Sequence, residues 1–236
     1  MQKNKIIFLI RAYNEATRIM DVIESIIAAG YEEILVVDDG STDGTQPLLR
    51  AMILSEQIHC VHHITNRGAG AALETGLEYI RQNAEAKNWK YLVTFDADGQ
   101  HDIADMGHFE DAFGADKSLD IVLGSRFIVK TNTNVPFIRR CILAGGRIFT
   151  SLVSGIHLTD AHNGYRMMRV GVLDRVRITM DGMEYASELI DQIAIHHLHF
   201  QEVPVNIHYD EYTLGKGQRY GGPLRIVIRM LFKKFF

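Results

Sequence analysis

The sequence predicts an α/β fold in which helices cover a mainly parallel sheet. Short apolar runs, most of them rich in β-branched residues, have the length of strands and recur at residues 6–10, 34–37, 58–64, 91–95 and 121–123. Amphipathic helical patterns separate these runs, and such alternation is typical of βαβ units. The 236 residues are 47% hydrophobic, which is enough apolar material for one large core.

Composition argues against several classes of protein. The net charge of −4 disfavours a dedicated nucleic-acid-binding protein. No apolar run approaches the roughly 18 residues of a membrane-spanning helix. Lys3 and Lys5 precede only a strand-length run, so we expect no signal peptide. Cys60 and Cys141 form no Cys-x-x-Cys pair, which disfavours a disulfide framework or a thiolate zinc site. These features predict a cytoplasmic protein.

The first half of the chain contains two helical stripes. The first stripe consists of Ile19, Val22, Ile23, Ile26 and Ile27, and the second of Leu73, Leu77, Ile80 and Ala84. Gly30 follows the first stripe where a left-handed C-cap is expected. In parallel sheets ligands bind outside the carboxyl ends of the strands, so the polar residues after each apolar run are the candidates for function.

The second half has a different pattern. A helical stretch containing Arg139, Arg140 and Arg147 leads to the polar segment 160–166. A further helix carries one apolar face, formed by Ala186, Leu189, Ile190, Ile193 and Ala194. Residues 202–207 have a strand-like pattern, and Pro204 predicts an edge position in the sheet. The chain shows no linker and no internal repeat, so we expect a single domain over residues 1–222.

Two carboxylates follow the fourth apolar run. Asp96 and Asp98 are two residues apart, so in an extended segment their side chains point to the same side. Such carboxylates repel each other unless a cation lies between them. Mg²⁺ and Mn²⁺ are held in this way, together with substrate phosphate oxygens. The carbonyl oxygen of Gln100 is a further candidate ligand, and Asp102 is a candidate cap of the next helix. The alternative interpretation is a polar turn without a metal.

A second acidic pair and an arginine also lie at this predicted edge. Asp38 and Asp39 precede a glycine turn and can accept hydrogen bonds from a ribose hydroxyl or a base N–H. Asp43 is expected to be only a helix cap. Arg126 follows the fifth run and suits a diphosphate or a carboxylate, although a surface arginine fits the pattern equally well.

Residues 66–73 open a helix after the third run. Their Gly-x-Gly lacks the full dinucleotide fingerprint, and no glycine follows the first run, which disfavours a Rossmann dehydrogenase. We expect the start of this helix, with Arg67, either to lie near a phosphate or to pack closely. His62 and His63 lack the spacing of metal ligands and are interpreted as packing and surface residues.

Together, these segments resemble glycosyltransferase family 2, and within it the branch of dolichol- and polyprenol-phosphate mannosyltransferases. The matching pieces occur in the order of the family, over about residues 5 to 218, at 12–15, 36–45, 66–70, 96–101, 124–127, 160–166 and 202–204. The resemblance implies a GT-A fold. It also implies inverting transfer of a sugar from a UDP- or GDP-type nucleoside-diphosphate sugar to a polyprenyl phosphate or a lipid-linked glycan, in cell-surface polysaccharide or glycolipid synthesis.

The resemblance also assigns roles to individual residues. By this likeness the residues that line the nucleotide pocket are Tyr13, Glu15, Val37 and Asp39. Asp96, Ala97 and Asp98 are expected to contact the donor, and Mg²⁺ or Mn²⁺ is expected to be held by Asp96, Asp98 and Gln100. Arg126 is expected to face the diphosphate, and Lys216 resembles the basic residue that the polyprenol-phosphate enzymes place on a late loop over the phosphates.

The chain departs from the family pattern at two places. Arg11-Ala12 stands where the family usually has a proline before the Tyr-Asn-Glu element, and the arginine upstream of the late lysine is absent from residues 209–212. The second departure favours a lipid-linked sugar as acceptor. A hydroxyl acceptor requires a general base, and the candidates are Asp160 and Glu188. Alternatively, Asp160 is a turn residue and Glu188 a solvated helix position. An ionised phosphate acceptor needs no base.

The C-terminus is basic and amphipathic. On a helix over residues 223–236, Arg225, Arg229 and Lys233 lie opposite a wide apolar face. This pattern predicts a peripheral position on the cytoplasmic face of a membrane, although docking on the core or on a partner subunit fits it too. The oligomeric state is not predicted. The rival functions are a sugar nucleotidyltransferase, which would need a phosphate loop that residues 11–18 lack, and a non-catalytic nucleotide-sugar-binding protein.

Overall fold

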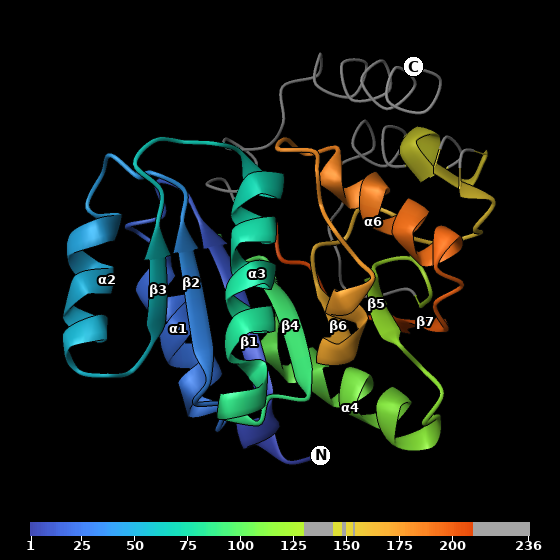
Figure 1. Ribbon diagram of the computed structural model, residues 1–236, viewed down its shortest axis with the longest axis horizontal. Helices are drawn as coiled ribbons and strands as arrows, with labels where there is room; N and C mark the ends of the chain where they lie inside the picture. The colour runs from blue at the N-terminus through green and yellow to red at the C-terminus, as the bar shows by residue number, and fades with distance from the viewer. Residues whose placement is uncertain (130–143, 148–149, 153, 210–236) are drawn as a thin grey trace.

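The computed structural model describes the chain except for residues 130–143, 148–149, 153 and 210–236 (Figure 1). Seven strands form one sheet in the order β3-β2-β1-β4-β6-β5-β7. In chain order they are β1 Ile6–Ala12, β2 Ile34–Asp38, β3 His59–His62, β4 Tyr91–Asp96, β5 Ile121–Ser125, β6 Arg166–Arg169 and β7 Phe200–Pro204. All neighbouring strands are parallel except that β6 runs antiparallel between β4 and β5. The predicted α/β class and the mainly parallel sheet are therefore confirmed.

The helices cover both faces of this sheet. They are α1 Ile19–Ala28, α2 Thr45–Leu54, α3 Ala69–Lys87, α4 Met106–Ala115 and α6 Tyr185–Ile195, with short 3₁₀ turns at Lys3–Lys5, Ile103–Asp105 and Val170–Asp174. Helices α1, α2 and α4 contribute to one apolar cluster, while α3 and α6 contribute to the cluster on the other face. Figure 1 shows α3 in front of the sheet and α1 behind it. Burial on both faces explains why the strands are nearly continuous apolar runs.

Several local predictions are confirmed, and one strand was missed. Gly30 has a φ of 85° just after α1, as a left-handed C-cap requires. Pro204 lies on β7, which is an edge strand. Strand β6 was not predicted because Arg166-Met167-Met168-Arg169 contains no β-branched residue. Within the described residues no helix is long and apolar enough to cross a membrane. The predicted helix over 223–236 and its boundary lie outside the described residues, so the division of domains stays a prediction.

Helix α3 begins in close contact with the segment before α6. The amides of Gly70 and Ala71 donate to the carbonyl oxygen of Asp181, at 2.7 and 3.2 Å. A Cβ atom on Gly70 would overlap the carbonyl oxygen of Met180. Of the two expectations for this helix start, the structure therefore shows close packing, because a backbone carbonyl already satisfies its first amides.

Gly70→Ala is expected to destabilise the protein by about 3 kcal/mol, because the added methyl must push two backbone segments apart. Urea unfolding measures this change. Gly107→Ala in α4 is the matched control, since a Cβ there meets nothing within 4 Å. The control should be neutral or more stable by roughly 0.5–1 kcal/mol. Equal stability of the two variants would contradict the close contact between α3 and residues 180–182.

Candidate functional site

The carboxyl ends of β1 and β2 fix two loops against each other. The amide of Asp39 donates to the carbonyl of Ala12 at 2.8 Å, continuing the pairing of the two strands. Beyond it, the amide of Asn14 donates to Ser41 Oγ at 2.9 Å, and Asn14 Oδ1 accepts from the amide of Thr42 at 2.8 Å. Asn14 adopts a φ of 56°, which asparagine tolerates better than most residues. These contacts place the 13–15 loop over the 38–45 turn.

The residues expected in a nucleotide pocket divide into two groups. Tyr13 presents a side chain that is 43% exposed, and Glu15, two residues later in the same loop, is mostly buried. The side chain of Val37, in contrast, is fully buried in the cluster beneath α3, and Ala97 is buried in the opposite cluster. The structure therefore brings Tyr13 and Glu15 to the loop region, whereas the side chains of Val37 and Ala97 pack in the core.

Asp39 holds the loop before α3. Its carboxylate accepts from the amides of Arg67 and Gly68, both at 2.8 Å, and lies 2.7 Å from Nδ1 of His63. Nε2 of His63 lies 2.9 Å from Thr75 Oγ1 on α3. Asp39 is 3% exposed, so this carboxylate is anchored on three sides at the edge of the site. The structure therefore shows how Asp39 is anchored, and its contact with a nucleotide stays a prediction.

His62 ends β3 and His63 follows it; both were interpreted as packing and surface residues, and the burial of His63, at 8% exposure, agrees with a packing role. Parallel pairing places Asp38 beside His62, whose Nδ1 lies 3.2 Å from Asp38 Oδ2. His63 then follows beside Asp39. These two acid–histidine contacts were not predicted. Their signal in the sequence is the matching order of two acids and two histidines at the ends of neighbouring parallel strands.

Both carboxylate oxygens of Asp96 are paired, although its side chain is 33% exposed. One carboxylate oxygen forms an ion pair with Arg11, and the other lies 3.2 Å from Nε2 of His101. Burial raises the pKa of Asp96, but the Arg11 charge and the His101 hydrogen bond outweigh this effect and lower the pKa below its usual range. A Cβ on Gly164 would overlap this carboxylate, so the glycine leaves the space that Asp96 occupies. The guanidinium of Arg11 also lies over the ring of Tyr185, 4.7 Å from its centroid.

Asp98 lacks the ion pair that stabilises the negative charge of Asp96. Among the described residues it forms no ion pair, and its Oδ1 accepts only from the amide of Gln100 at 3.0 Å. Burial, and then the negative charge of Asp96, raise the pKa of Asp98 to about 6. The cation that this carboxylate lacks is what a divalent ion supplies, so the site fits Mg²⁺ or Mn²⁺.

The ligand set for a metal is incomplete without substrate. In the part of the chain that the structure describes, no three acidic, histidine or cysteine side chains form a metal-binding group. The carbonyl oxygen of Gln100 accepts from the amide of His208 at 2.9 Å, which leaves it one lone pair. A metal held mainly by Asp98 therefore needs further oxygens from a ligand such as a diphosphate. Asp102, as expected, caps the next turn by accepting from Ala104 N at 2.9 Å.

Arg126 and Asp160 form a buried, two-pronged ion pair. Arg126 Nε donates to Asp160 Oδ2 at 2.6 Å, and Nη2 donates to Oδ1 at 2.7 Å. Both side chains are at most 6% exposed. Burial raises the pKa of Asp160, but the charge and hydrogen bonds of Arg126 outweigh it, so the pKa is lowered. Asp160 is therefore a partner of Arg126, and a role as general base would require this pair to open.

Glu188 is buried rather than solvated, at 5% exposure. Its carboxylate accepts from Thr179 N, from Thr179 Oγ1 at 2.7 Å and from Met180 N at 2.9 Å. It thus ties α6 to the segment whose Asp181 carbonyl caps α3. The alternative of a solvated helix position was wrong. Lys216 lies outside the described residues.

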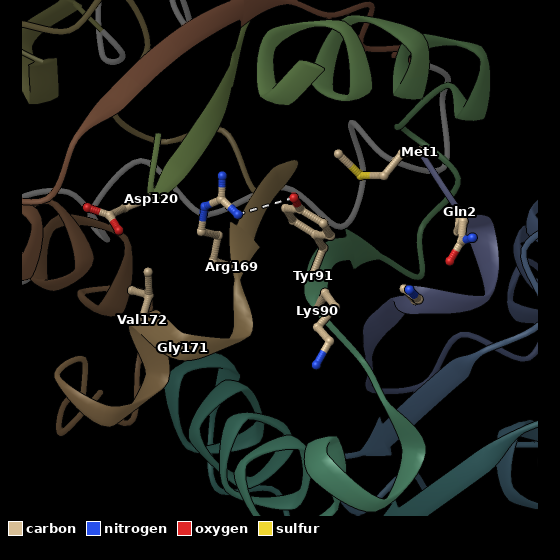
Figure 2. Close-up of a pocket in the computed structure, with 9 residues that line it drawn as sticks. Met1, Gln2, Lys90, Tyr91, Asp120, Arg169, Gly171 and Val172 are labelled. Carbon is tan, nitrogen blue, oxygen red and sulfur yellow. Dashed lines mark hydrogen bonds between the residues drawn. The ribbon is translucent and has the colours of Figure 1, made fainter. Parts of the chain in front are cut away.

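A cavity of about 600 Å³ lies at the opposite edge of the sheet, where β1 and β4 begin (Figure 2). Arg169 on its wall donates to the hydroxyl of Tyr91 at 3.2 Å, and to the carbonyls of Leu119 and Lys117 at 2.7 and 2.9 Å. Because these donors are already used, and because ligands of parallel sheets bind at the other edge, this cavity is not the candidate site.

The order of these elements and loops corresponds to a known family. A family model described as "Glycosyl transferase family 2" matches residues 7–177. The chain belongs to glycosyltransferase family 2. The resemblance inferred from the motifs is thereby confirmed, and its implied GT-A fold agrees with the observed sheet and helices.

Similar proteins support the same branch. A UDP-N-acetylglucosamine–dolichyl-phosphate N-acetylglucosaminyltransferase of Methanococcus voltae is 29% identical, covering 98% of this family-2 chain and 97% of the relative. The polyprenol monophosphomannose synthase of Mycolicibacterium smegmatis is also 29% identical, covering 92% and 82%. Among solved structures, glucosyl-3-phosphoglycerate synthase from Mycobacterium tuberculosis, in complex with Mn²⁺, UDP and phosphoglyceric acid, has a TM-score of 0.67 at 18% identity, covering 97% of this chain and 78% of that one. This last likeness shows the fold.

Proposed function

We propose that this protein is a metal-dependent, inverting glycosyltransferase that moves a sugar from a nucleoside-diphosphate sugar to a polyprenyl phosphate. The observation that carries the proposal is Asp98, a half-buried carboxylate that forms no ion pair with any described residue, next to the loops that Asp39 and Asn14 organise. One relative is named for transfer to dolichyl phosphate and another for synthesis of polyprenol monophosphomannose, which supports this class of acceptor.

Each residue has a defined task in this proposal. Tyr13 and Glu15 line the nucleoside side, and the anchored Asp39 fixes that wall of the pocket. Asp98, with Asp96 and Gln100 beside it, holds Mg²⁺ or Mn²⁺. When bound, the metal neutralises charge on the departing nucleoside diphosphate. The acceptor oxygen attacks the anomeric carbon from the opposite face as the bond to the diphosphate breaks, which inverts the configuration.

The hydrogen bonds of the two candidate general bases, Asp160 and Glu188, favour a phosphate acceptor. Both oxygens of Asp160 accept hydrogen bonds from Arg126, and Glu188 accepts from the 179–180 segment. A general base must be able to take a proton from the acceptor, which carboxylates held in this way are poorly placed to do. An ionised phosphate attacks without a base. A lipid-linked sugar hydroxyl remains the second candidate acceptor, and it would require one of these carboxylates to be released.

We also propose that the protein works peripherally at the cytoplasmic face of a membrane. An acceptor with a polyprenyl tail lies in the bilayer, and the basic, apolar sequence of residues 223–236 suits anionic lipid. Deleting these residues should weaken co-sedimentation with anionic liposomes.

Nucleotide binding with and without metal tests the proposed function. At a concentration of 100 times Kd, a bound nucleotide adds about 2.7 kcal/mol of stability, which raises the Tm by roughly 5–10 °C for a chain of this size. We expect UDP or GDP to produce this shift with Mn²⁺ or Mg²⁺ present, and much less with EDTA. Comparing UDP with GDP identifies the base. No shift with either nucleotide, in the presence of metal, would contradict the proposal.

A further inference from the structure

Arg166 is placed at the same edge of the sheet as the candidate site. It is the first residue of β6, and it pairs with Thr94 of β4 and Leu123 of β5. Because β6 is antiparallel, its first residue lies where its neighbours end. Asp96 follows Thr94 by two residues on β4, so the Arg166 and Asp96 side chains emerge on the same face of the sheet.

This arginine is buried without a carboxylate. It is 2% exposed, and none of the described carboxylates forms an ion pair with it. Its hydrogen bond is a long one, from Nη2 to the carbonyl of Ala161 at 3.5 Å, and its guanidinium lies 5.9 Å from the ring centroid of Tyr185. Burying a charge in this way is costly unless another group compensates it.

The surroundings supply only part of that compensation. The nearest acidic groups, Asp96 and Asp160, each already bind another arginine, Arg11 and Arg126. Burial lowers the pKa of Arg166, and the charge of Arg11 adds to this lowering. Tyr185, and to a smaller extent Asp96 and Asp160, oppose it, but the pKa stays below its usual value. The segments around it also carry a surplus of donors, since Arg11 Nε and Asn163 Nδ2 are buried without an acceptor. The chemistry that this region lacks is an oxyanion.

We propose that Arg166 is a phosphate-binding residue whose guanidinium donates to an oxygen of a substrate phosphate. A planar guanidinium matches phosphate geometry and stays charged under all relevant conditions. The phosphate belongs either to the diphosphate of the donor or to the monophosphate of the lipid acceptor, because both must meet at this edge. The inference rests on the proposed function and adds a site that the motif-based assignment did not contain.

The test compares binding with stability in the full chain. Arg166→Met removes the charge and keeps a similar side-chain volume, while Arg166→Lys keeps the charge but loses the paired N–H donors of the planar guanidinium. Calorimetry with two probes, UDP with Mn²⁺ and farnesyl phosphate, measures affinity. We expect Arg166→Met to weaken at least one probe by roughly 10- to 100-fold, with Arg166→Lys in between. Loss of UDP binding assigns the residue to the donor, and loss of farnesyl phosphate binding assigns it to the acceptor.

Stability separates binding from a structural role. A buried charge without a partner does not stabilise the fold, so the urea midpoint of Arg166→Met should equal or exceed that of the wild type. The matched control is Arg169→Met on the same strand. Arg169 donates to the carbonyls of Leu119 and Lys117 and to the hydroxyl of Tyr91, and Figure 2 shows the last of these contacts. The control should lose stability and keep both affinities.

Three outcomes are distinguishable. If wild type binds a probe and Arg166→Met binds both probes within twofold of it, the assignment of Arg166 is wrong and the proposed function survives. If Arg166→Met loses stability as the control does, Arg166 is a structural residue. If the wild type itself binds neither probe, the proposed function fails, and the inference about Arg166 fails with it.

Discussion

Asp98→Asn is expected to lower kcat for sugar transfer by roughly 10²–10³-fold at saturating Mn²⁺. The asparagine keeps the shape of the side chain but removes the charge that would hold the metal against the diphosphate. Because burial and Asp96 make the ionised carboxylate unfavourable, the neutral variant should be as stable as the wild type or more stable. Steady-state kinetics and urea unfolding of the same preparation measure both effects.

Asp102→Asn is the control for this substitution. Asp102 lies in the same loop and caps the turn at Ile103–Asp105 through the amide of Ala104. Its replacement should change stability by less than about 1 kcal/mol and leave kcat unchanged. Full turnover by Asp98→Asn at saturating metal would show that the metal assignment is wrong.

Asp160→Asn is expected to destabilise the fold by about 3–5 kcal/mol, because it leaves the Arg126 guanidinium buried without its counter-charge. Urea unfolding measures this loss. The double variant Arg126→Met/Asp160→Leu removes both charges and should recover a large part of it. If Asp160→Asn kept full stability and lost only kcat, Asp160 would be acting as a base and the ion pair would contribute little.

The parts of the fold that follow from local patterns were predictable. Strands β1 and β2 begin with the unbroken apolar runs 6–10 and 34–37, and α1 has a regular apolar stripe followed by Gly30. Asp96 and Asp98 could be found because two carboxylates that are two residues apart, just after an apolar run, are typical of a divalent-cation site. These features depend on neighbours in the sequence.

The features that were missed depend on neighbours in space. The sequence around Glu188 is that of an ordinary helical glutamate. Its role depends on the 179–180 segment, in which two amides and one hydroxyl donate hydrogen bonds to its carboxylate. Asp160 and Arg126 are 34 residues apart, and only the pairing around β5 and β6 brings them together. The burial of Arg166 likewise requires β6, a strand whose composition gave no signal.

The most direct measurement is transfer of a labelled sugar to lipid. The full chain is incubated with Mn²⁺, a set of radiolabelled UDP- and GDP-sugars, and a polyprenyl phosphate in vesicles, and the organic phase is counted. We predict that label from one donor enters the organic phase, that EDTA abolishes the transfer, and that Asp98→Asn reduces it at least about 100-fold. If folded protein with metal transfers label from none of these donors to the polyprenyl phosphate, the proposed reaction is contradicted.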